Sequence, residues 1–471
     1  MCPKPLFHLL FIACISLACE KHTSDPIIEE GDRLTVFFVN DQHGQLNNFA
    51  KVKHIVDLER ARGNVLLLSA GDLFSGNPIV DQYSEKGYPM IDVMNQVEFD
   101  VSVLGNHEFD YGLETLEDRL QQSDFPWVCA NMDVRSSGLS QPQPFITLQV
   151  GELNVTVLGL IETFGSTDRV IPATHPWRVQ GLSFEHYYEM VSDYNDLKSL
   201  EGANLYIALT HLGTQNDQLI ANDYPYFDLI IGGHSNDINR GEVNGIPTLM
   251  AGANLSHLGR VEVTIVDQEV VDHNVSMIDL EQYEDMDSEL MALIQSYNDA
   301  PEFEEVVGWA NSHHNRTELG CFFTTALREQ MDVDIAIQNS GGIRAEIDAG
   351  EITAMEIYRM DPFNNGSVVF TKTAGEIKSF LEETGVGLHV SGVSLTRVGD
   401  EIEMKDESGN IIGDDVSLTL GSNDYIPAVF ESYFPFEEAD VRSVTTVETI
   451  LQYLDANPTV DFEGCDQFFR Y

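Results

Sequence analysis

From residue 34 onward, short apolar runs alternate with polar loops and with segments of helical periodicity. Six runs have the length and composition of buried strands, at residues 34–39, 65–69, 101–104, 155–159, 205–209 and 229–231. Helical patterns such as residues 45–61 lie between several of them, and further strands are expected at 248–250 and 261–265. Strands that alternate with helices are typical of layered α/β domains. This alternation predicts an α/β fold for the first part of the chain.

A second globular segment begins near residue 311, with an amphipathic helix at about 318–331, a strand at 335–338 and a later helix at 374–383. The acidic stretch that precedes it has helical spacing and predicts a connecting helix. A chain of 471 residues is longer than most single domains. We therefore expect a leader at 1–19, a tether at 20–32, a first domain at 33–282, a linker helix at 283–310 and a second domain at 311–471.

The N-terminus has the pattern of an export signal. Lys4 precedes an apolar run at residues 6–17, which is too short for a comfortable membrane span and fits a removed signal peptide. The segment Ser16-Leu17-Ala18-Cys19 resembles a bacterial lipoprotein box, in which the cysteine becomes the lipidated first residue. Two outcomes stay open for Cys19, a lipid anchor to a membrane or an incidental place in a cleaved signal. In both, the protein is exported to the periplasm or the cell surface.

Outside the leader the chain has three cysteines, Cys129, Cys321 and Cys465, whose spacing matches neither a CxxC pair nor a zinc finger. In an oxidising compartment Cys321 and Cys465 could form a disulfide, and buried free thiols are an equal alternative.

The net charge limits the class of partner. The 25 Lys and Arg residues against 77 Asp and Glu residues give a formal charge of −52, spread along the whole chain. Such a surface repels nucleic-acid backbones over long range, which argues against duplex DNA or RNA as a partner. An anionic substrate would need a local cationic site, such as bound metal ions.

Polar residues of one chemical kind follow five of the expected strands. They are Asp41 and His43; Asp72; Asn106, His107 and Asp110; His211; and His234 and Asn236. Because the carboxyl ends of strands line the ligand crevice of an α/β sheet, these side chains should converge. Each motif alone could equally be a turn or a helix cap. Together they offer too many carboxylate, imidazole and amide ligands for one tetrahedral ion, and they predict two divalent ions such as Zn or Mn.

The blocks GNHEFDYG at residues 105–112 and GGHS at 232–235 resemble the metallophosphoesterase (calcineurin-like) superfamily, in its 5′-nucleotidase, UDP-sugar hydrolase and 2′,3′-cyclic-nucleotide phosphodiesterase branch. The resemblance extends from about residue 33 through the second domain. It implies a four-layered α/β/β/α metal domain joined by a helix to a smaller α/β substrate-binding domain.

The same resemblance implies a ligand for each metal position. One ion would be held by Asp41, His43, Asp72 and Asn236, and the other by Asp72, Asn106, His211 and His234. The side chain at Asn236 departs from the commoner histidine, which predicts looser binding or another metal preference. His107 and Asp110, three residues apart, would form a catalytic dyad that stabilises the phosphoryl group or protonates the leaving oxygen.

In the second domain, the segment that contains Asn339, Gly341, Gly342 and Arg344 resembles the substrate-binding loop of this family. Successive glycines let backbone N–H groups approach an anion, and the arginine is a forked cation suited to phosphate. Phe363 and Tyr425 match two positions that stack on a nucleotide base, although core packing is the default for an aromatic side chain.

One departure from the family pattern concerns the same pocket. Relatives usually have a Gly-Gly-Asp-Gly loop after the second aromatic, whereas residues 426–432 here read IPAVFES. The wall of the pocket is therefore expected to differ.

These observations predict a metal-dependent phosphoesterase that hydrolyses nucleoside 5′-monophosphates with a metal-activated water. Cyclic nucleotides, nucleotide sugars or a non-nucleotide ester are alternative substrates. A surface lipoprotein that binds nucleotide or metal without turnover is a third hypothesis.

Overall fold

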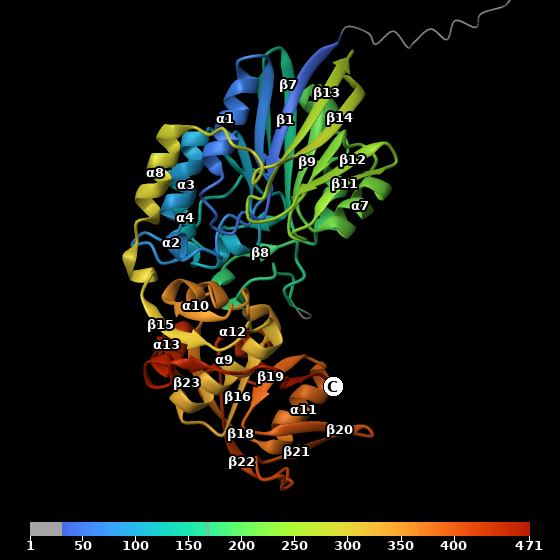
Figure 1. Ribbon diagram of the computed structural model, residues 1–471. Coiled ribbons are helices and arrows are strands. Elements are labelled where there is room, and N and C mark those ends of the chain that lie inside the picture. Colours follow the sequence, from blue (N-terminus) through green and yellow to red (C-terminus); the bar gives the residue numbers. More distant parts are fainter. Residues whose placement is uncertain (1–30, 167–168) are drawn as a thin grey trace, which may run out of the picture.

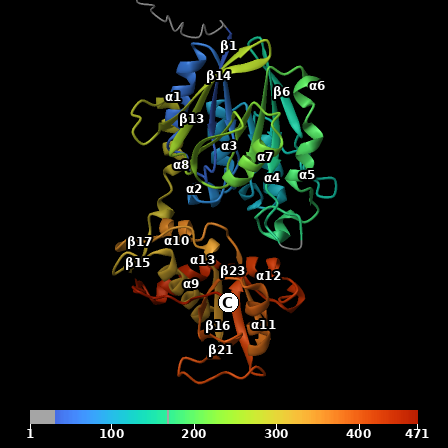
Figure 2. The same cartoon turned by 90° about the vertical axis from the view of Figure 1, so that its right-hand side faces the viewer.

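The computed structural model describes residues 31–166 and 169–471. The expected signal peptide, Cys19 and most of the expected tether lie outside these residues. The described chain forms two domains, one above the other in Figure 1, and the view in Figure 2 shows the same division.

Two six-stranded sheets form the centre of the first domain. Their strand orders are β14-β13-β1-β2-β3-β4 and β11-β12-β10-β9-β7-β6. Strands β1 to β4 are parallel to one another, as are β7, β9, β10 and β12. The first sheet contains β1 (Asp32–Val39), β2 (Asn64–Ser69), β3 (Val101–Val103), β4 (Trp127–Val128), β13 (His257–Val266) and β14 (Glu269–Asp279). The second contains β6 (Phe145–Val150), β7 (Leu153–Ile161), β9 (Leu205–His211), β10 (Leu229–Ile231), β11 (Ile238–Val243) and β12 (Ile246–Ala251).

The alternation of side chains along each strand divides the core into layers. Val36 and Ile207 belong to a hydrophobic cluster between the sheets, whereas Phe37 and Tyr206 belong to clusters under the outer helices. The helices over the first sheet are α1 (Phe49–Arg60), α2 (Pro78–Asp81), α3 (Tyr88–Val97), α4 (Leu113–Gln122) and α8 (Ser288–Asn298). Those over the second are α5 (Tyr187–Met190), α6 (Leu197–Glu201) and α7 (Thr214–Asp223). The expected four-layered α/β/β/α arrangement is confirmed.

A six-stranded sheet of order β23-β18-β22-β16-β19-β25 and a three-stranded sheet of order β17-β15-β24 form the second domain. The strands are β15 (Val306–Ala310), β16 (Ile335–Asn339), β17 (Gly350–Thr353), β18 (Gly366–Thr373), β19 (Leu388–Ser391), β22 (Ser417–Asn423), β23 (Asp440–Thr445), β24 (Thr459–Val460) and β25 (Phe468–Phe469). The helices are α9 (Arg316–Met331), α10 (Ala354–Met360), α11 (Ala374–Thr384), α12 (Tyr425–Val429) and α13 (Thr446–Ala456). A hairpin of β20 (Ser394–Val398) and β21 (Glu401–Lys405) projects from it (Figure 1). The expected smaller α/β domain is present.

The segment between the domains is less helical than expected. The linker helix anticipated at 283–310 is limited to α8, which begins after Asp287, whose side chain accepts a hydrogen bond from the Leu290 amide at 2.8 Å. The helix ends before Pro301, which disfavours helical geometry in the residue preceding it. Leu290 and Ile294 are buried in the core of the first domain. α8 is therefore part of that domain, and it runs along its side in Figure 1.

Cys321 on α9 and Cys465 near the C-terminus form a disulfide across 144 residues of sequence, while Cys129 is buried and free. Of the two alternatives left open for the pair, the structure therefore has the disulfide.

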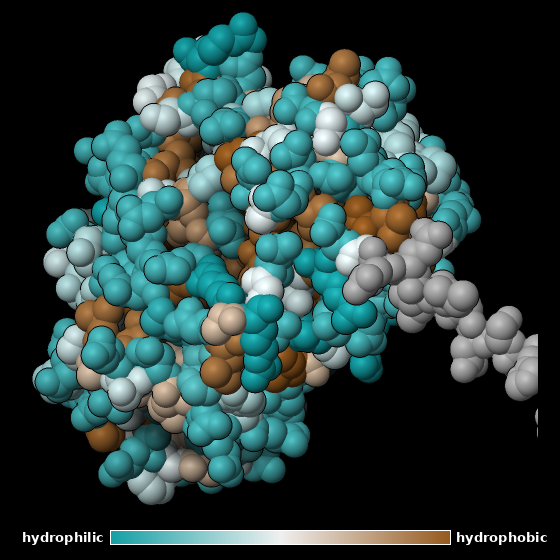
Figure 3. Space-filling view, turned by 90° about the horizontal axis from the view of Figure 1, so that it is seen from above, coloured by the Kyte–Doolittle hydropathy of each residue, from teal (hydrophilic) through white to brown (hydrophobic). Residues whose placement is uncertain are grey.

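The surface agrees with the acidic composition. The face in Figure 3 is mainly hydrophilic, with hydrophobic residues in smaller areas between. Among the described residues, no helix has both the length and the apolar character that a bilayer span requires.

Candidate active site

The loops after β1, β2, β3 and β10, together with the last residue of β9, bring all seven expected metal ligands to one place. At the centre, Nε2 of His211 lies 3.0 Å from Oδ2 of Asp72. The amide of His234 donates to Oδ1 of Asp41 at 3.0 Å. Two side-chain contacts complete the group, His234 Nδ1 to Asn106 Oδ1 at 2.9 Å and His43 Nε2 to Asn236 Oδ1 at 3.2 Å.

Five of these residues have left-handed backbone conformations. The φ angles are 50° at Asp41, 48° at His43, 57° at Asp72, 81° at His234 and 58° at Asn236. Residues other than glycine seldom adopt positive φ, and such strain is typical of functional sites, where the surrounding structure enforces it.

Part of that enforcement comes from Glu108, to which the sequence analysis assigned no role. Its carboxylate is buried and accepts hydrogen bonds from the amides of Asp72 at 3.0 Å and Leu73 at 2.6 Å, and from the amide of Gly105. Glu108 therefore holds the loop after β2 against the loop after β3.

The donor set fits divalent cations. Nδ1 of His211 contacts the carbonyl oxygen of Ala70 at 2.7 Å, so Nδ1 carries the proton of that hydrogen bond. The other ring nitrogen, Nε2, is buried without a hydrogen-bond partner and faces Asp72 at 3.0 Å and Asp41 at 4.0 Å. The two carboxylates favour positive charge at this nitrogen: burial disfavours the charged ring, but Asp72 and Asp41 raise its pKa to about 10, and a divalent cation bound here would take the place of that proton.

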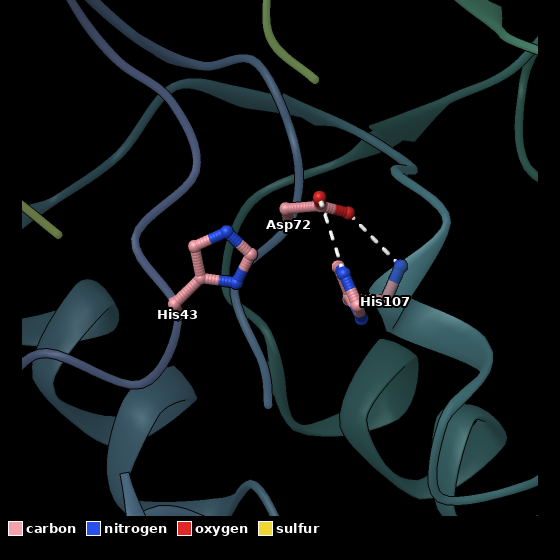
Figure 4. Close-up of side chains that lie close together, drawn as sticks. All are labelled: His43, Asp72 and His107. Atoms are coloured by element: carbon pink, nitrogen blue, oxygen red, sulfur yellow. Dashed lines mark hydrogen bonds and ion pairs between the residues drawn. The ribbon is translucent and has the colours of Figure 1, made fainter. Parts of the chain in front are cut away.

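Two sets of candidate ligand atoms each lie within 4.8 Å of one another, His43 with Asp72 and His107, and Asp72 with His211 and His234. Asp72 belongs to both, as expected for a bridging ligand. The approach of His107 to the first set was not anticipated. Figure 4 shows Asp72 between the rings of His43 and His107.

Burial lowers the pKa of both His43 and His234 to about 4, and positively charged histidine neighbours act in the same direction. At neutral pH both rings are therefore unprotonated, which is the form that binds metal. Burial would raise the pKa of Asp72, but His211 and His107 outweigh it and hold that pKa well below its usual value. Asp72 is therefore a carboxylate.

Next to the metal ligands, Nδ1 of His107 lies 2.6 Å from Oδ2 of Asp110, so the expected dyad is in hydrogen-bond contact. Asp110 also accepts hydrogen bonds from the hydroxyls of Ser75 at 2.6 Å and Thr174 at 3.2 Å. Burial disfavours the charged ring of His107, but the carboxylates of Asp72 and Asp110 raise its pKa to about 9. A protonated His107 can donate to an oxygen of a bound ester.

A cavity of about 250 Å³ extends from this cluster to the second domain. All six residues expected to bind substrate line it: Asn339, Gly341, Gly342, Arg344, Phe363 and Tyr425. Five of the expected metal ligands line it as well, and Asp41 and His211 lie behind them, fully buried. The cluster of candidate metal ligands, hereafter the metal cluster, and the expected substrate loop therefore line the same cavity.

Phe363 and Tyr425, the two aromatic residues expected to stack on a nucleotide base, contact different rings. The ring of Phe363 stacks on His107, with centroids 5.8 Å apart and planes 20° apart, and the guanidinium of Arg344 lies 5.7 Å from its centroid. The ring of Tyr425 meets His175 edge to face at 5.9 Å. A base between the two rings stays a prediction.

Sequence reasoning missed five further residues of the cavity wall: Ala173, Thr174, His175, Arg178 and Asn365. The first four lie in or just before η2 (Pro176–Val179), a short 3-10 helix that no strand directly precedes. This helix packs on α12, which is formed by the segment that replaces the glycine-rich loop of relatives.

Comparisons with known proteins agree with this geometry. The calcineurin-like phosphoesterase model matches residues 34–236, and the 5′-nucleotidase C-terminal domain model matches residues 302–411. The trifunctional nucleotide phosphoesterase protein YfkN of Bacillus subtilis is 30% identical over 86% of this chain and 32% of its own length. The endonuclease YhcR of the same organism is 23% identical over 83% of this chain and 37% of its own length. The chain thus spans about a third of the length of these two relatives.

The 5′-nucleotidase of Vibrio cholerae is 24% identical over 77% of this chain and 79% of that protein. Among solved structures, the 5′-nucleotidase precursor of Thermus thermophilus shares the fold with a TM-score of 0.77 and 22% identity, over 91% of this chain and 97% of that one.

Proposed function

This chain belongs to the 5′-nucleotidase family of calcineurin-like phosphoesterases and is a phosphoesterase hydrolase, and from that premise we propose that it hydrolyses nucleoside 5′-monophosphates to nucleoside and phosphate. One observation carries the proposal. The metal cluster of the first domain and the Asn339–Arg344 loop of the second line the same cavity. An ester of nucleoside size can therefore present its phosphate to one domain and its leaving group to the other.

Two divalent ions would be held by the ligands expected from the sequence, one by Asp41, His43, Asp72 and Asn236, and the other by Asp72, Asn106, His211 and His234. When bound, such ions supply a nucleophile from water at neutral pH and neutralise charge on the phosphate oxygens. The mixture of imidazole, carboxylate and amide donors suits Zn or Mn.

The residues of the chain carry out the remaining work. Arg344 is mostly buried at the cavity and provides a fixed positive charge for phosphate oxygens. His107 donates its Nε2 proton toward the leaving oxygen or the phosphoryl group, and Asp110 orients the ring through Nδ1.

The test is phosphate release from AMP by purified protein with Mn²⁺, Zn²⁺ or a chelator. Asp72→Ala removes the residue shared by both ion positions, and Asp118→Ala, at an exposed position on α4, is the matched control. We expect release that requires metal, that is lost in Asp72→Ala and that is retained in Asp118→Ala. No release from any phosphate ester, with metal demonstrably bound, would contradict the proposal and favour a binding protein without turnover.

The altered segment supports a second candidate substrate class. Where relatives have glycines, residues 425–429 form α12 against η2, so this wall of the cavity has a different shape. A cyclic nucleotide, a nucleotide sugar or a non-nucleotide ester is the alternative. A panel of such esters assayed beside AMP separates these cases, because cleavage of one of them without cleavage of AMP keeps the catalytic site and changes the substrate.

We further propose that the enzyme acts outside the cytoplasm, anchored through Cys19. The apolar run at residues 6–17 and the disulfide between Cys321 and Cys465 support export. The mass of the mature N-terminus, isolated from the native host, tests this. A diacylated Cys19 is expected, and an unmodified later residue would contradict the anchor.

A further inference from the structure

Arg178 contacts both domains beside the cavity. Its Nη2 donates to the carbonyl oxygen of Phe363 at 2.9 Å and to Oδ1 of Asn365 at 3.3 Å, and both acceptors belong to the second domain. Its Nη1 lies 3.8 Å from Oδ1 of Asp110, in the first domain. The planar fork of a guanidinium can serve several acceptors at once in a fixed geometry. One side chain thus joins the acid of the dyad to the second domain.

Four residues make a closed circuit of contacts: Arg178, Phe363, His107 and Asp110. Arg178 holds the backbone of Phe363, and the ring of Phe363 stacks on the ring of His107. His107 is bonded to Asp110, and Asp110 faces Arg178 again. The imidazole is therefore held from one side by a carboxylate and from another by an aromatic ring, and Arg178 is in contact with both of those groups.

The other partners of Asp110 do not depend on the second domain in this way. The hydroxyls of Ser75 and Thr174 hold the carboxylate from within the first domain. These two hydrogen bonds involve no residue of the second domain. Arg178 differs because its two hydrogen-bond acceptors, Phe363 and Asn365, belong to the second domain.

We propose that Arg178 is a positioning residue that couples docking of the second domain to the alignment of the His107–Asp110 pair. The inference rests on the proposed function, in which that pair acts on the ester. Docking supplies the acceptors that orient the guanidinium, and the oriented guanidinium fixes Asp110 and, through it, His107. Efficient hydrolysis is thereby tied to the arrangement in which the substrate loop faces the metal cluster.

The experiment compares kcat and KM for AMP and for a small aryl phosphate in wild type, Arg178→Ala, Arg178→Lys and Trp177→Ala. Trp177 is the matched control because its ring packs on Phe436 across the same interface, with centroids 4.5 Å apart. Metal content and thermal unfolding are measured for every variant. A variant that does not fold is replaced by Arg178→Gln.

We expect Arg178→Ala to lower kcat by roughly tenfold to a hundredfold for both substrates, because a small misalignment of a reacting group costs that much. KM should change little, metal content should stay at the wild-type level, and Trp177→Ala should keep the wild-type kcat. Added guanidinium ion should restore part of the kcat of Arg178→Ala, and Arg178→Lys should be intermediate. Rescue of this kind is not expected from a purely structural role.

Three results would overturn the inference: an unchanged kcat in Arg178→Ala, an equal loss in Trp177→Ala, or a loss that follows loss of metal. If the wild type is active and any of these results is found, the role of Arg178 is refuted and the proposed function is not affected. A wild type that hydrolyses neither substrate refutes the proposed function instead, and the inference falls with it.

Discussion

The disulfide between Cys321 and Cys465 should determine the stability of the second domain separately from the first. It closes a loop of 144 residues that contains most strands of the second domain. In the chain-entropy model a crosslink of that length stabilises the folded state by about 5 kcal/mol, and removal of native disulfides typically costs 2–5 kcal/mol. We therefore expect the double variant Cys321→Ala/Cys465→Ala to lose about 3–5 kcal/mol of unfolding free energy in the second domain.

The assay is native-state hydrogen exchange along a urea series, because it reports the two domains separately where one unfolding curve would not. The protected amides of β16 and β22 report the second domain, and those of β1 and β2 the first. Cys129→Ala is the control, since it removes a buried thiol of the first domain without removing a crosslink. If β16 and β22 in the double variant lose no more than β1 and β2 lose in Cys129→Ala, the reasoning from loop closure is refuted.

Three further predictions concern the metal cluster and its surroundings. Gly233→Ala would place a Cβ 2.7 Å from Nδ1 of His211, so it should weaken metal binding by about tenfold or more in chelator competition; Gly63→Ala, whose Cβ meets nothing within 4 Å, should leave binding unchanged. Burial raises the pKa of the Asp217 carboxyl from 3.8 to about 7. The folded protein therefore holds this proton more tightly than the unfolded chain, and the stability that this provides is fully present below about pH 4 and is lost as the pH rises to about 7. In urea unfolding, the unfolding free energy of Asp217→Asn relative to that of wild type should therefore increase by about 3 kcal/mol from pH 5 to pH 8. A difference between the two proteins that does not change with pH would contradict this. Asn236→His replaces an amide oxygen with imidazole, so one of the two metal equivalents should resist chelator longer, and equal loss of both would show that this position holds no ion.

The sequence contains strong signals for the first domain and for the metal cluster. Each strand that positions a ligand is an apolar run that contains or is followed within a few residues by Asp, His or Asn, so strand and ligand are readable together. The ligand positions Asp72 and His211 lie far apart in sequence, yet the rule that strand ends share one edge was enough to bring them together.

Contacts between the domains were not readable in this way. Arg178 lies in a segment with no periodicity, and its hydrogen-bond acceptors belong to the other domain. The ring of Phe363 was expected to face a base, and its packing on His107 depends on how the domains sit together. For Cys321 and Cys465, separation along the chain carries no information about pairing. The linker was overestimated because the helical spacing of the acidic stretch was given more weight than Pro301, which is present in the sequence and lies just after the end of α8.

The cavity with walls from two domains has a consequence for how such an enzyme can change. In the proposed function, bond cleavage falls to strand-end residues of one domain, and selection of the leaving group to loops of the other, which line the same cavity. The two properties are therefore separable by substitution. Exchange of residues 425–436, which form α12 and the surface that meets η2, should shift KM between esters while metal content is conserved. A hydrolytic half that stays constant and a recognition half that is free to vary would make this architecture a ready starting point for new specificities.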